Sequence, residues 1–199
     1  IEGYSPTLPA AYTKLPYVLL ANIHPDVQGR VLDQMKRPKF VVADTMDLWL
    51  NIARPAVLKL LKRIDCLVLN DSESSQLVEE DNVVAAIPRI HQLGPKYVII
   101  KKGEHGSILS GPKGPFIAPA YPLKKVVDPT GAGDSFVGGM MGYLANQKGS
   151  VENNIRGGII HGSVTASFCC EDFGLKKTTK IKKADISKRV RELTKMASW

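Results

Sequence analysis

A short run of residues in the second half of the chain has the types and spacing that phosphate chemistry needs. The run Asp128-Pro-Thr-Gly-Ala-Gly-Asp134 stands directly before an apolar, glycine-studded segment that is predicted to be helical. Such a turn presents backbone N–H groups at a helix N-terminus, where the helix dipole also favours an anion. Asp134 would repel that anion unless it has a chemical task, and the economical task is to take a proton from an attacking hydroxyl. These residues predict phosphoryl transfer to an alcohol.

The same seven residues resemble the C-terminal signature of the PfkB, or ribokinase-like, carbohydrate and nucleoside kinases. The resemblance implies that the amides of Gly131, Ala132 and Gly133 form an anion hole for the transferring phosphoryl group, with Asp134 as the catalytic base. It also implies that ATP and Mg²⁺ are used and that a sugar is phosphorylated. Taken as bare residues, the turn could instead be a helix cap, because Asp stabilises the first turn of many helices. The order of all seven residues favours the kinase interpretation.

Asn70 and Glu73 are a second candidate pair, spaced three residues apart at the end of a predicted strand. At this spacing both side chains could face a cleft, where Glu73 could hold Mg²⁺ through water. The pair resembles the Asn-x-x-Glu motif of the same kinases, which helps to place magnesium and phosphate. The alternative is a capping arrangement, because Asn followed by Glu is also a signature of a helix start. Its position upstream of Asp134 favours the functional interpretation.

The segment from Lys101 to Gly106 is a third candidate, with glycines at positions 103 and 106. The glycines allow a tight turn and a close approach of a ligand to the backbone. The segment resembles the Gly-x-x-Gly turn beside the nucleotide in the family, with Gly103 and Gly106 as its glycines. Many members carry Thr before this turn, whereas this chain has Lys101 and Lys102, and a lysine can approach phosphate as a point charge. A plain hairpin turn is the equal alternative.

Asp128 opens the long signature, and the resemblance implies a role for it in binding a monovalent cation, K⁺, near the anion hole. The alternative is a turn-forming carboxylate, which is common in loops. The four histidines show no spacing typical of metal ligands, so we expect no zinc site.

Short apolar runs alternate with helical patterns along the chain, which predicts an α/β fold with a mostly parallel sheet. The predicted strands are Tyr17–Asn22, Phe40–Asp44, Cys66–Asn70, Tyr97–Lys101, Gly106–Ser110 and Phe116–Ala118, the last two antiparallel because their connection is short. The predicted helices are Pro25–Met35, Pro55–Arg63, Glu73–Glu79, Asn82–Leu93, Gly133–Asn146, Val151–Cys170 and Ala184–Met196.

Four of the predicted strands end in a polar residue, namely Asn22, Asp44, Asn70 and Lys101. In open α/β sheets ligands bind outside the carboxyl ends of the strands. Each residue alone could be a turn former or a helix cap. Four in succession predict a shared cleft.

The composition, with 44% hydrophobic and 23% charged residues, is that of an ordinary globular protein. The chain shows no signal-peptide layout and no apolar run near the length of a membrane span, which predicts a cytoplasmic protein without a membrane partner. The formal net charge of +8 comes largely from lysines and arginines near the C-terminus. Without interleaved aromatic residues, this charge indicates a solvated basic face that could attract ATP, rather than a nucleic-acid site. Cys66 and the pair Cys169-Cys170 are interpreted as packing residues.

The resemblance implies a ribokinase-like three-layer sandwich and one nucleotide-binding α/β domain over residues 1–199. It matches only the later part of such a kinase, so we expect the N-terminal strands and the lid to be missing, and any homodimer to form through that lid region. The most direct function is an ATP-dependent sugar kinase. The alternatives are a nucleoside kinase of the same family and a nucleotide-binding fragment or regulatory module without activity. The sequence leaves the acceptor open.

Overall fold

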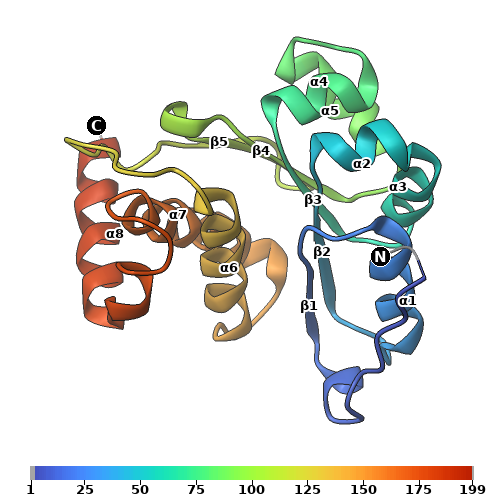
Figure 1. Ribbon diagram of the computed structural model, residues 1–199. Helices are drawn as coiled ribbons and strands as arrows, with labels where there is room; N and C mark the ends of the chain where they lie inside the picture. The colour runs from blue at the N-terminus through green and yellow to red at the C-terminus, as the bar shows by residue number, and fades with distance from the viewer. Residues whose placement is uncertain (1–2, 199) are drawn as a thin grey trace. The chain divides into compact units, whose positions relative to one another are not determined.

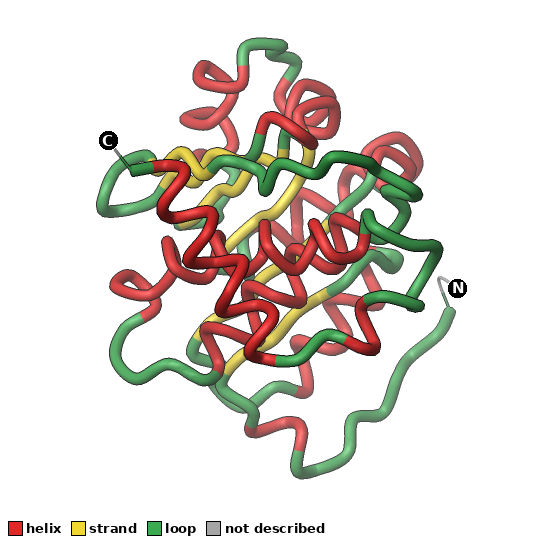
Figure 2. Tube along the Cα trace, turned by 90° about the vertical axis from the view of Figure 1, so that its left-hand side faces the viewer, coloured by secondary structure: helices red, strands yellow, loops and turns green. Residues whose placement is uncertain are grey.

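The computed structural model describes residues 3–198. The chain divides into two compact units: the first takes the residues up to Ile100 together with Ser110–Gly114, and the second takes Lys101–Leu109 and the residues from Pro115 onward. Figure 1 locates the elements by residue number, and Figure 2 distinguishes helices, strands and loops by colour. One nucleotide-binding domain over residues 1–199 stays a prediction.

Six strands form a mixed sheet in the order β1-β2-β3-β4-β5-β6. They are β1 (Tyr17–Leu20), β2 (Phe40–Asp44), β3 (Cys66–Asn70), β4 (Tyr97–Lys101), β5 (Ser107–Ser110) and β6 (Phe116–Ala118). Strands β1, β2 and β3 pair in parallel, with Tyr17 opposite Phe40 and Val42 opposite Cys66, whereas β5 and β6 pair antiparallel. The α/β class and the antiparallel pair are therefore confirmed. The prediction for β1 was too long, because the strand ends at Leu20 and Asn22 lies beyond it.

Eight α-helices lie within the described residues. They are α1 (Pro25–Gln34), α2 (Asp47–Ile52), α3 (Arg54–Leu61), α4 (Asp71–Val78), α5 (Val83–Gln92), α6 (Ala132–Ala145), α7 (Val151–Cys169) and α8 (Lys183–Ala197). The seven predicted helices are present with shifted ends, and α2 was not predicted. Short 3₁₀ turns occur at Tyr12–Lys14, Gly103–His105 and Thr178–Lys180. None of the helices in residues 3–198 is both long and apolar enough to span a bilayer.

The core of the first unit lies around β2, β3 and β4. Every residue of β2 is buried, and so are the first four residues of β3 and of β4. This burial explains why these strands read as continuous apolar runs, as is usual in parallel sheets with both faces covered. Cys66 is fully buried as predicted, and this burial raises the pKa of its thiol well above the ordinary range.

The second unit is built around the close packing of α6 against α7. A Cβ placed on Gly162 would lie 2.6 Å from the carbonyl oxygen of Phe136, and one on Gly139 would lie 2.4 Å from Thr165 Oγ1. The two helices therefore approach each other at positions where only glycine fits. Helix α8 packs on α7 through Leu193, which is buried with Val164 and Phe168. Helix α6, which begins at the candidate anion hole, is therefore held by α7, and α7 is held in turn by α8.

Candidate active site

Helix α6 begins at a glycine in the left-handed conformation. Gly131 has φ 80° and ψ 4°, and it is the N-cap residue of the helix. Glycine adopts this conformation without steric cost, whereas other residues do so rarely. The turn before it is closed by the N–H of Thr130, which donates to Asp128 Oδ1 at 2.9 Å. The predicted motif thus forms a turn followed by a helix N-terminus.

The backbone amides of this turn are not equivalent. The N–H of Ala132 donates to the carbonyl oxygen of Pro129 at 3.0 Å, and the first helical bond runs from Ser135 N–H to Gly131 O at 2.9 Å. The amides of Gly133 and Asp134 lie between these two bonds, in the part of a first turn that has no acceptor within its own helix. These two amides are suited to meet an anion.

Asp134 is exposed at the third position of α6. The following residues Phe136 and Val137 are buried, so they anchor the helix while the carboxylate stays on its open side. An exposed carboxylate in a first turn is accessible to a hydroxyl group of a ligand. The arrangement suits a general base.

The ammonium group of Lys101 lies against the start of α6. A Cβ placed on Gly133 would be 3.1 Å from Lys101 Nζ and 4.0 Å from its Cε. Both residues belong to the second unit. A lysine at a helix N-terminus adds a full positive charge to the partial charge of the helix dipole. The structure therefore brings together Lys101 and the Gly131–Asp134 turn.

The turn that follows Lys101 is a tight hairpin connection. The N–H of Lys102 donates to Gly106 O at 2.8 Å, which closes a 3₁₀ turn over Gly103–His105. Gly103 has φ 55° and Gly106 has φ 87°. A Cβ on Gly106 would lie 2.1 Å from Ala118 O, so the turn requires glycine there for packing as well as for conformation. The hairpin interpretation accounts for both glycines, and contact with a nucleotide stays a prediction.

Asn70 and Glu73 form a capping box at the start of α4, in the first unit. Asn70 Oδ1 accepts the N–H of Glu73 at 2.7 Å, and Glu73 Oε2 accepts the N–H of Asn70 at 2.7 Å. The Glu73 side chain is buried, with 6% of the residue exposed. The capping alternative is thus present in the structure. The box uses the single side-chain oxygen of Asn70 and one carboxylate oxygen of Glu73, and the magnesium role of the pair stays a prediction.

The donor chemistry of this pair fits a magnesium ion bound through water. Magnesium prefers oxygen ligands and retains several waters, so one or two protein oxygens suffice beside a phosphate. Asn70 and Glu73 supply an amide and a carboxylate. Within residues 3–198 there is no group of three or more His, Cys, Asp or Glu side chains that could hold a metal by themselves. The pair therefore fits a magnesium ion that water and phosphate also bind, rather than an ion bound by protein side chains alone.

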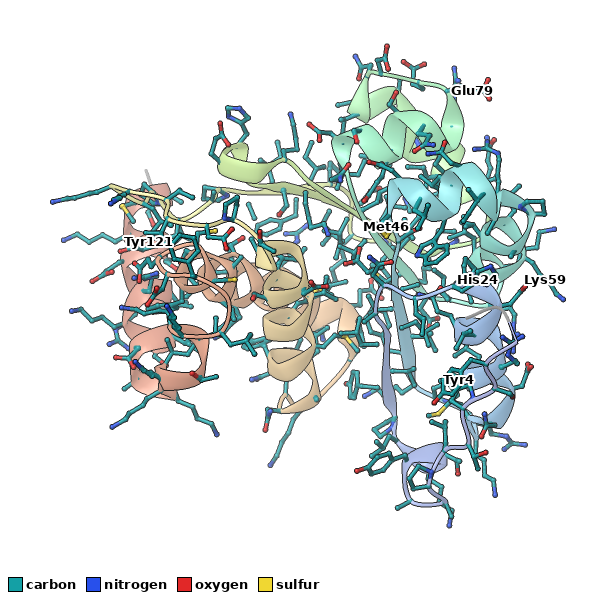
Figure 3. The ribbon with its side chains drawn as sticks, in the orientation of Figure 1. Tyr4, His24, Met46, Lys59, Glu79 and Tyr121 are labelled. Carbon is teal, nitrogen blue, oxygen red and sulfur yellow. The ribbon has the colours of Figure 1, made fainter. Side chains whose placement is uncertain are left out.

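Polar residues follow the parallel strands of the first unit at one edge. Asp44 ends β2 and is buried, and its Oδ1 accepts the N–H of Thr45 at 3.1 Å. Asn22 lies two residues beyond β1, where its side chain contacts Met46 Sδ at 2.9 Å and accepts the Trp49 Nε1–H at 2.7 Å. Met46 is labelled in Figure 3. Asn22 is therefore occupied in fixing the start of α2, a helix that the sequence pattern missed.

Asp128 serves as a turn former in the structure. Its carboxylate accepts the backbone N–H of Thr130 and is also hydrogen-bonded to the Thr130 side chain, and these bonds lower the pKa of Asp128 below its ordinary value. A carboxylate held in its charged form remains able to attract a cation. Its predicted role toward K⁺ is untested.

One cysteine near this turn has a contact that the sequence did not reveal. Cys169 Sγ lies 3.3 Å from Thr130 O, a contact between residues 39 positions apart. Cys169 was interpreted only as a packing residue, and no local pattern signals the contact because it joins the end of α7 to a distant loop. His161, another residue of α7, stacks on Tyr143 with ring centroids 4.1 Å apart and is a packed histidine.

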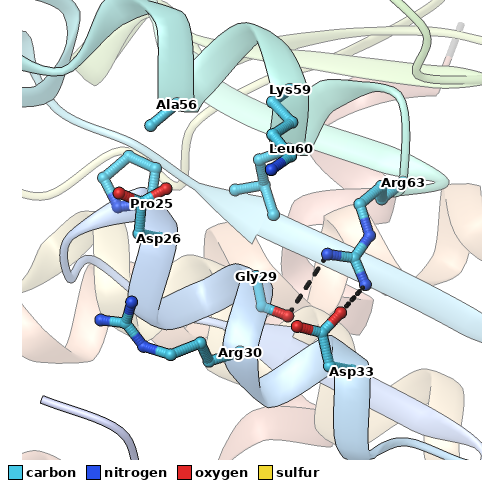
Figure 4. Close-up of a pocket in the computed structure, with 9 residues that line it drawn as sticks. All are labelled: Pro25, Asp26, Gly29, Arg30, Asp33, Ala56, Lys59, Leu60 and Arg63. Atoms are coloured by element: carbon cyan, nitrogen blue, oxygen red, sulfur yellow. Dashed lines mark hydrogen bonds and ion pairs between the residues drawn. The ribbon is translucent and has the colours of Figure 1, made fainter.

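A separate polar pocket lies between α1 and α3 in the first unit, and Figure 4 shows its lining. Arg63 crosses it, with Nη2 2.7 Å from Asp33 Oδ1 and Nη1 3.4 Å from Gly29 O. Lys59 and Asp26 also line the pocket. The lining carries charges of both signs, and Arg63 and Asp33 pair with each other.

Comparison with known proteins gives concordant matches. The sequence pattern of the pfkB family carbohydrate kinases matches residues 26–181. A cytidine kinase from Thermococcus kodakarensis is 31% identical over 143 residues, which are 68% of this chain and 50% of that protein. The structure of Arabidopsis thaliana ribokinase complexed with ribose and ATP matches with a TM-score of 0.71 and 25% identity, covering 88% of this chain and 56% of that one.

A fructokinase from Vibrio cholerae, solved with fructose, ADP and calcium ion, has the same fold. Its TM-score is 0.76 at 18% identity, over 89% of this chain and 61% of that chain. The chain spans about half the length of the cytidine kinase that it matches. The shared fold confirms the predicted ribokinase-like architecture.

Proposed function

The chain belongs to the pfkB family of carbohydrate kinases, and we propose that it carries the phosphoryl-transfer machinery of an ATP-dependent kinase acting on an alcohol group of a sugar. The observation that carries this proposal is the start of α6. There a left-handed glycine, the exposed Asp134 and the ammonium of Lys101 are combined in one compact unit. A helix cap alone does not need the lysine.

Asp134 is the proposed general base. Its carboxylate takes the proton of the acceptor hydroxyl while the hydroxyl oxygen attacks the γ-phosphorus of ATP and the bond to the β-phosphate oxygen breaks. Its exposure at the helix start supports this role, because the acceptor must reach the carboxylate from solvent.

The proposed anion hole consists of the amides of Gly131, Ala132 and Gly133. Because the N–H of Ala132 donates to the carbonyl oxygen of Pro129, the amides of Gly131, Gly133 and Asp134 are the principal donors. Donors fixed before the reaction stabilise the charge that develops on the phosphoryl oxygens without reorganising. Lys101 adds a point charge at the same helix end, and Gly103 and Gly106 shape the turn beside the nucleotide.

Asn70 and Glu73 are the residues proposed to place Mg²⁺, through water. The ion, when bound, neutralises part of the charge on the phosphate oxygens. Asp128, which is held in its charged form, is proposed to attract K⁺ near the anion hole. The assembly of a homodimer through a lid region and a cytoplasmic location are further proposals.

A nucleoside is the second candidate acceptor. The cytidine kinase match, at 31% identity over 68% of this chain, favours this alternative. Sugars and nucleosides both present an alcohol hydroxyl, so the chemistry at Asp134 is the same for either. A third candidate is a nucleotide-binding module without activity.

We expect Asp134→Asn in the full-length protein to lower turnover by ~10²–10⁴, the usual contribution of a general base. The affinity for ATP should be retained, because the amides and Lys101 are unchanged. The measurements are kcat by a coupled ADP-release assay and ATP affinity by calorimetry. Turnover near that of the unaltered protein would remove Asp134 from the base role.

A screen of acceptors decides among the three candidates. Ribose, fructose, 2-dehydro-3-deoxygluconate, cytidine and adenosine are each incubated with ATP, Mg²⁺ and the full-length protein. Phosphorylated sugar supports the main proposal, and a phosphorylated nucleoside supports the alternative. ATP binding without any transfer points to the module, and absence of ATP binding overturns the proposed function.

A further inference from the structure

The carboxyl end of α7 holds the loop that precedes the candidate anion hole. The carbonyl oxygen of Cys170 accepts the N–H of Val127 at 2.8 Å and that of Asp128 at 3.5 Å. Cys169 Sγ donates to Thr130 O at 3.3 Å. The start of loop 127–131 is thus bonded to Cys170 and its end to Cys169, and all of these residues belong to the second unit.

The contact with Thr130 has a consequence for the next residue. The carbonyl of Thr130 and the N–H of Gly131 belong to one peptide group, which is planar and trans, so they point in opposite directions. When the carbonyl points to Cys169, the N–H of Gly131 must point away from α7. A Cβ placed on Gly131 would lie 3.7 Å from Cys169 Sγ, an ordinary packing distance, so the thiol also contacts this residue.

We propose that Cys169 is a positioning residue that orients the Gly131 amide for phosphoryl binding. This inference rests on the proposed function for its catalytic consequence, but not for the hydrogen bond itself. The Cys169 side chain is buried, with 3% of the residue exposed. A thiol is a weak donor, and its bond to Thr130 O favours one direction of the peptide plane between Thr130 and Gly131.

The end of α7 is itself fixed from α8, so it can act as a support. Arg189 donates to Ser167 Oγ at 2.8 Å and to Glu171 Oε1 at 2.7 Å, on either side of Cys169. Its guanidinium lies 3.6 Å from the Phe168 ring centroid and 4.5 Å from that of Tyr121. Tyr121 is labelled in Figure 3 and donates to Glu192 of α8. The end of α7 is therefore held by α8 and by Tyr121.

Three variants test the role of the thiol. Cys169→Ala removes the donor, Cys169→Ser retains a donor, and Cys66→Ala removes another buried thiol, from β3 of the first unit. The first measurement is hydrogen–deuterium exchange of segment 127–134, which needs no substrate. The second is kcat and KM with the acceptor that the screen identifies, at a temperature where circular dichroism shows all variants folded.

We expect Cys169→Ala to speed exchange in segment 127–134 and to lower kcat roughly threefold to tenfold, with the acceptor KM within about twofold. Cys169→Ser should restore both properties, which a role in packing alone would not produce, because a buried serine is smaller and more polar than cysteine. Cys66→Ala should change neither exchange in the segment nor kcat.

Two outcomes overturn the inference: exchange in Cys169→Ala equal to that in Cys66→Ala, or a serine variant as impaired as the alanine variant. Failure of the proposed function has a different signature. In that case the unaltered protein transfers no phosphoryl group, while exchange still reports whether the thiol holds the loop.

Discussion

Lys101 and Lys102 are neighbours in the sequence but have different places in the structure. The Lys101 ammonium lies beside Gly133 at the start of α6, whereas Lys102 contributes its main-chain N–H to the turn that Gly106 closes. Both side chains are half-buried. The pair therefore allows a matched comparison of one lysine at the helix end with one outside it.

We expect Lys101→Met to weaken ATP binding by roughly tenfold, because a charge-assisted contact to phosphate is lost. Adenosine binding should change little, since adenosine carries no phosphate. Lys102→Met is the control and should retain ATP affinity within about twofold. Calorimetric titration of both ligands measures the effect. Equal losses in the two variants would contradict a specific role for Lys101.

At the residue scale the sequence predicted what lies within one local motif. Asp134 and Gly131 could be placed because turn chemistry and helix capping depend on neighbouring residues. The contact of Cys169 with Thr130 could not, because 39 residues separate them and the packing of α7 against α6 decides it. Lys101 was predicted to approach phosphate because it precedes the Gly103–Gly106 turn. Its position beside Gly133 is set by the fold and could not be predicted from the local sequence.

At the element scale, the pairing of α6 with α7 explains some of the glycines in these helices but not all of them. Gly162 is buried against Phe136 O, whereas a Cβ on Gly138 would meet nothing within 4 Å. These two glycines therefore differ in their effect on stability. The first is needed for contact, and the second is unfavourable for helix stability.

We expect Gly162→Ala to lower the free energy of unfolding by about 1–3 kcal/mol, because the added methyl group forces the helices apart. Gly138→Ala should raise it by about 0.5–1 kcal/mol, because alanine has the higher helix propensity. Urea denaturation followed by circular dichroism measures both. A Gly162→Ala variant as stable as the unaltered protein would show that α6 and α7 can separate without cost.

The sequence predicted the buried strands and the three-residue strand β6 correctly, extended β1 too far and missed α2. Strands β2, β3 and β4 are continuous apolar runs between turn residues, and the structure begins and ends them at the predicted residues. Strand β1 was extended too far because Ala21 and Asn22 continue its pattern without belonging to the ladder. Helix α2 has six residues, too few for a helical period to be visible, and its start depends on the distant side chain of Asn22.

At the scale of the whole molecule, the formal net charge of +8 creates a positive field around the protein. We expect the rate of ATP association to fall several-fold between about 20 mM and 200 mM salt, because salt screens this attraction. Adenosine should associate at a rate that salt changes little. Stopped-flow measurements with fluorescent analogues of both compare the two. A rate for ATP that does not change with salt would exclude electrostatic steering.

The capping box of Asn70 and Glu73 has a consequence for mutational screens. Each side chain already satisfies a backbone amide that would otherwise be unpaired at the start of α4. Under the proposed function the same two side chains also help to place magnesium. A substitution at either residue would then reduce thermal tolerance and metal affinity together, so a selection based on growth would score two distinct defects as one. Only titrations with magnesium well below the melting temperature would separate them.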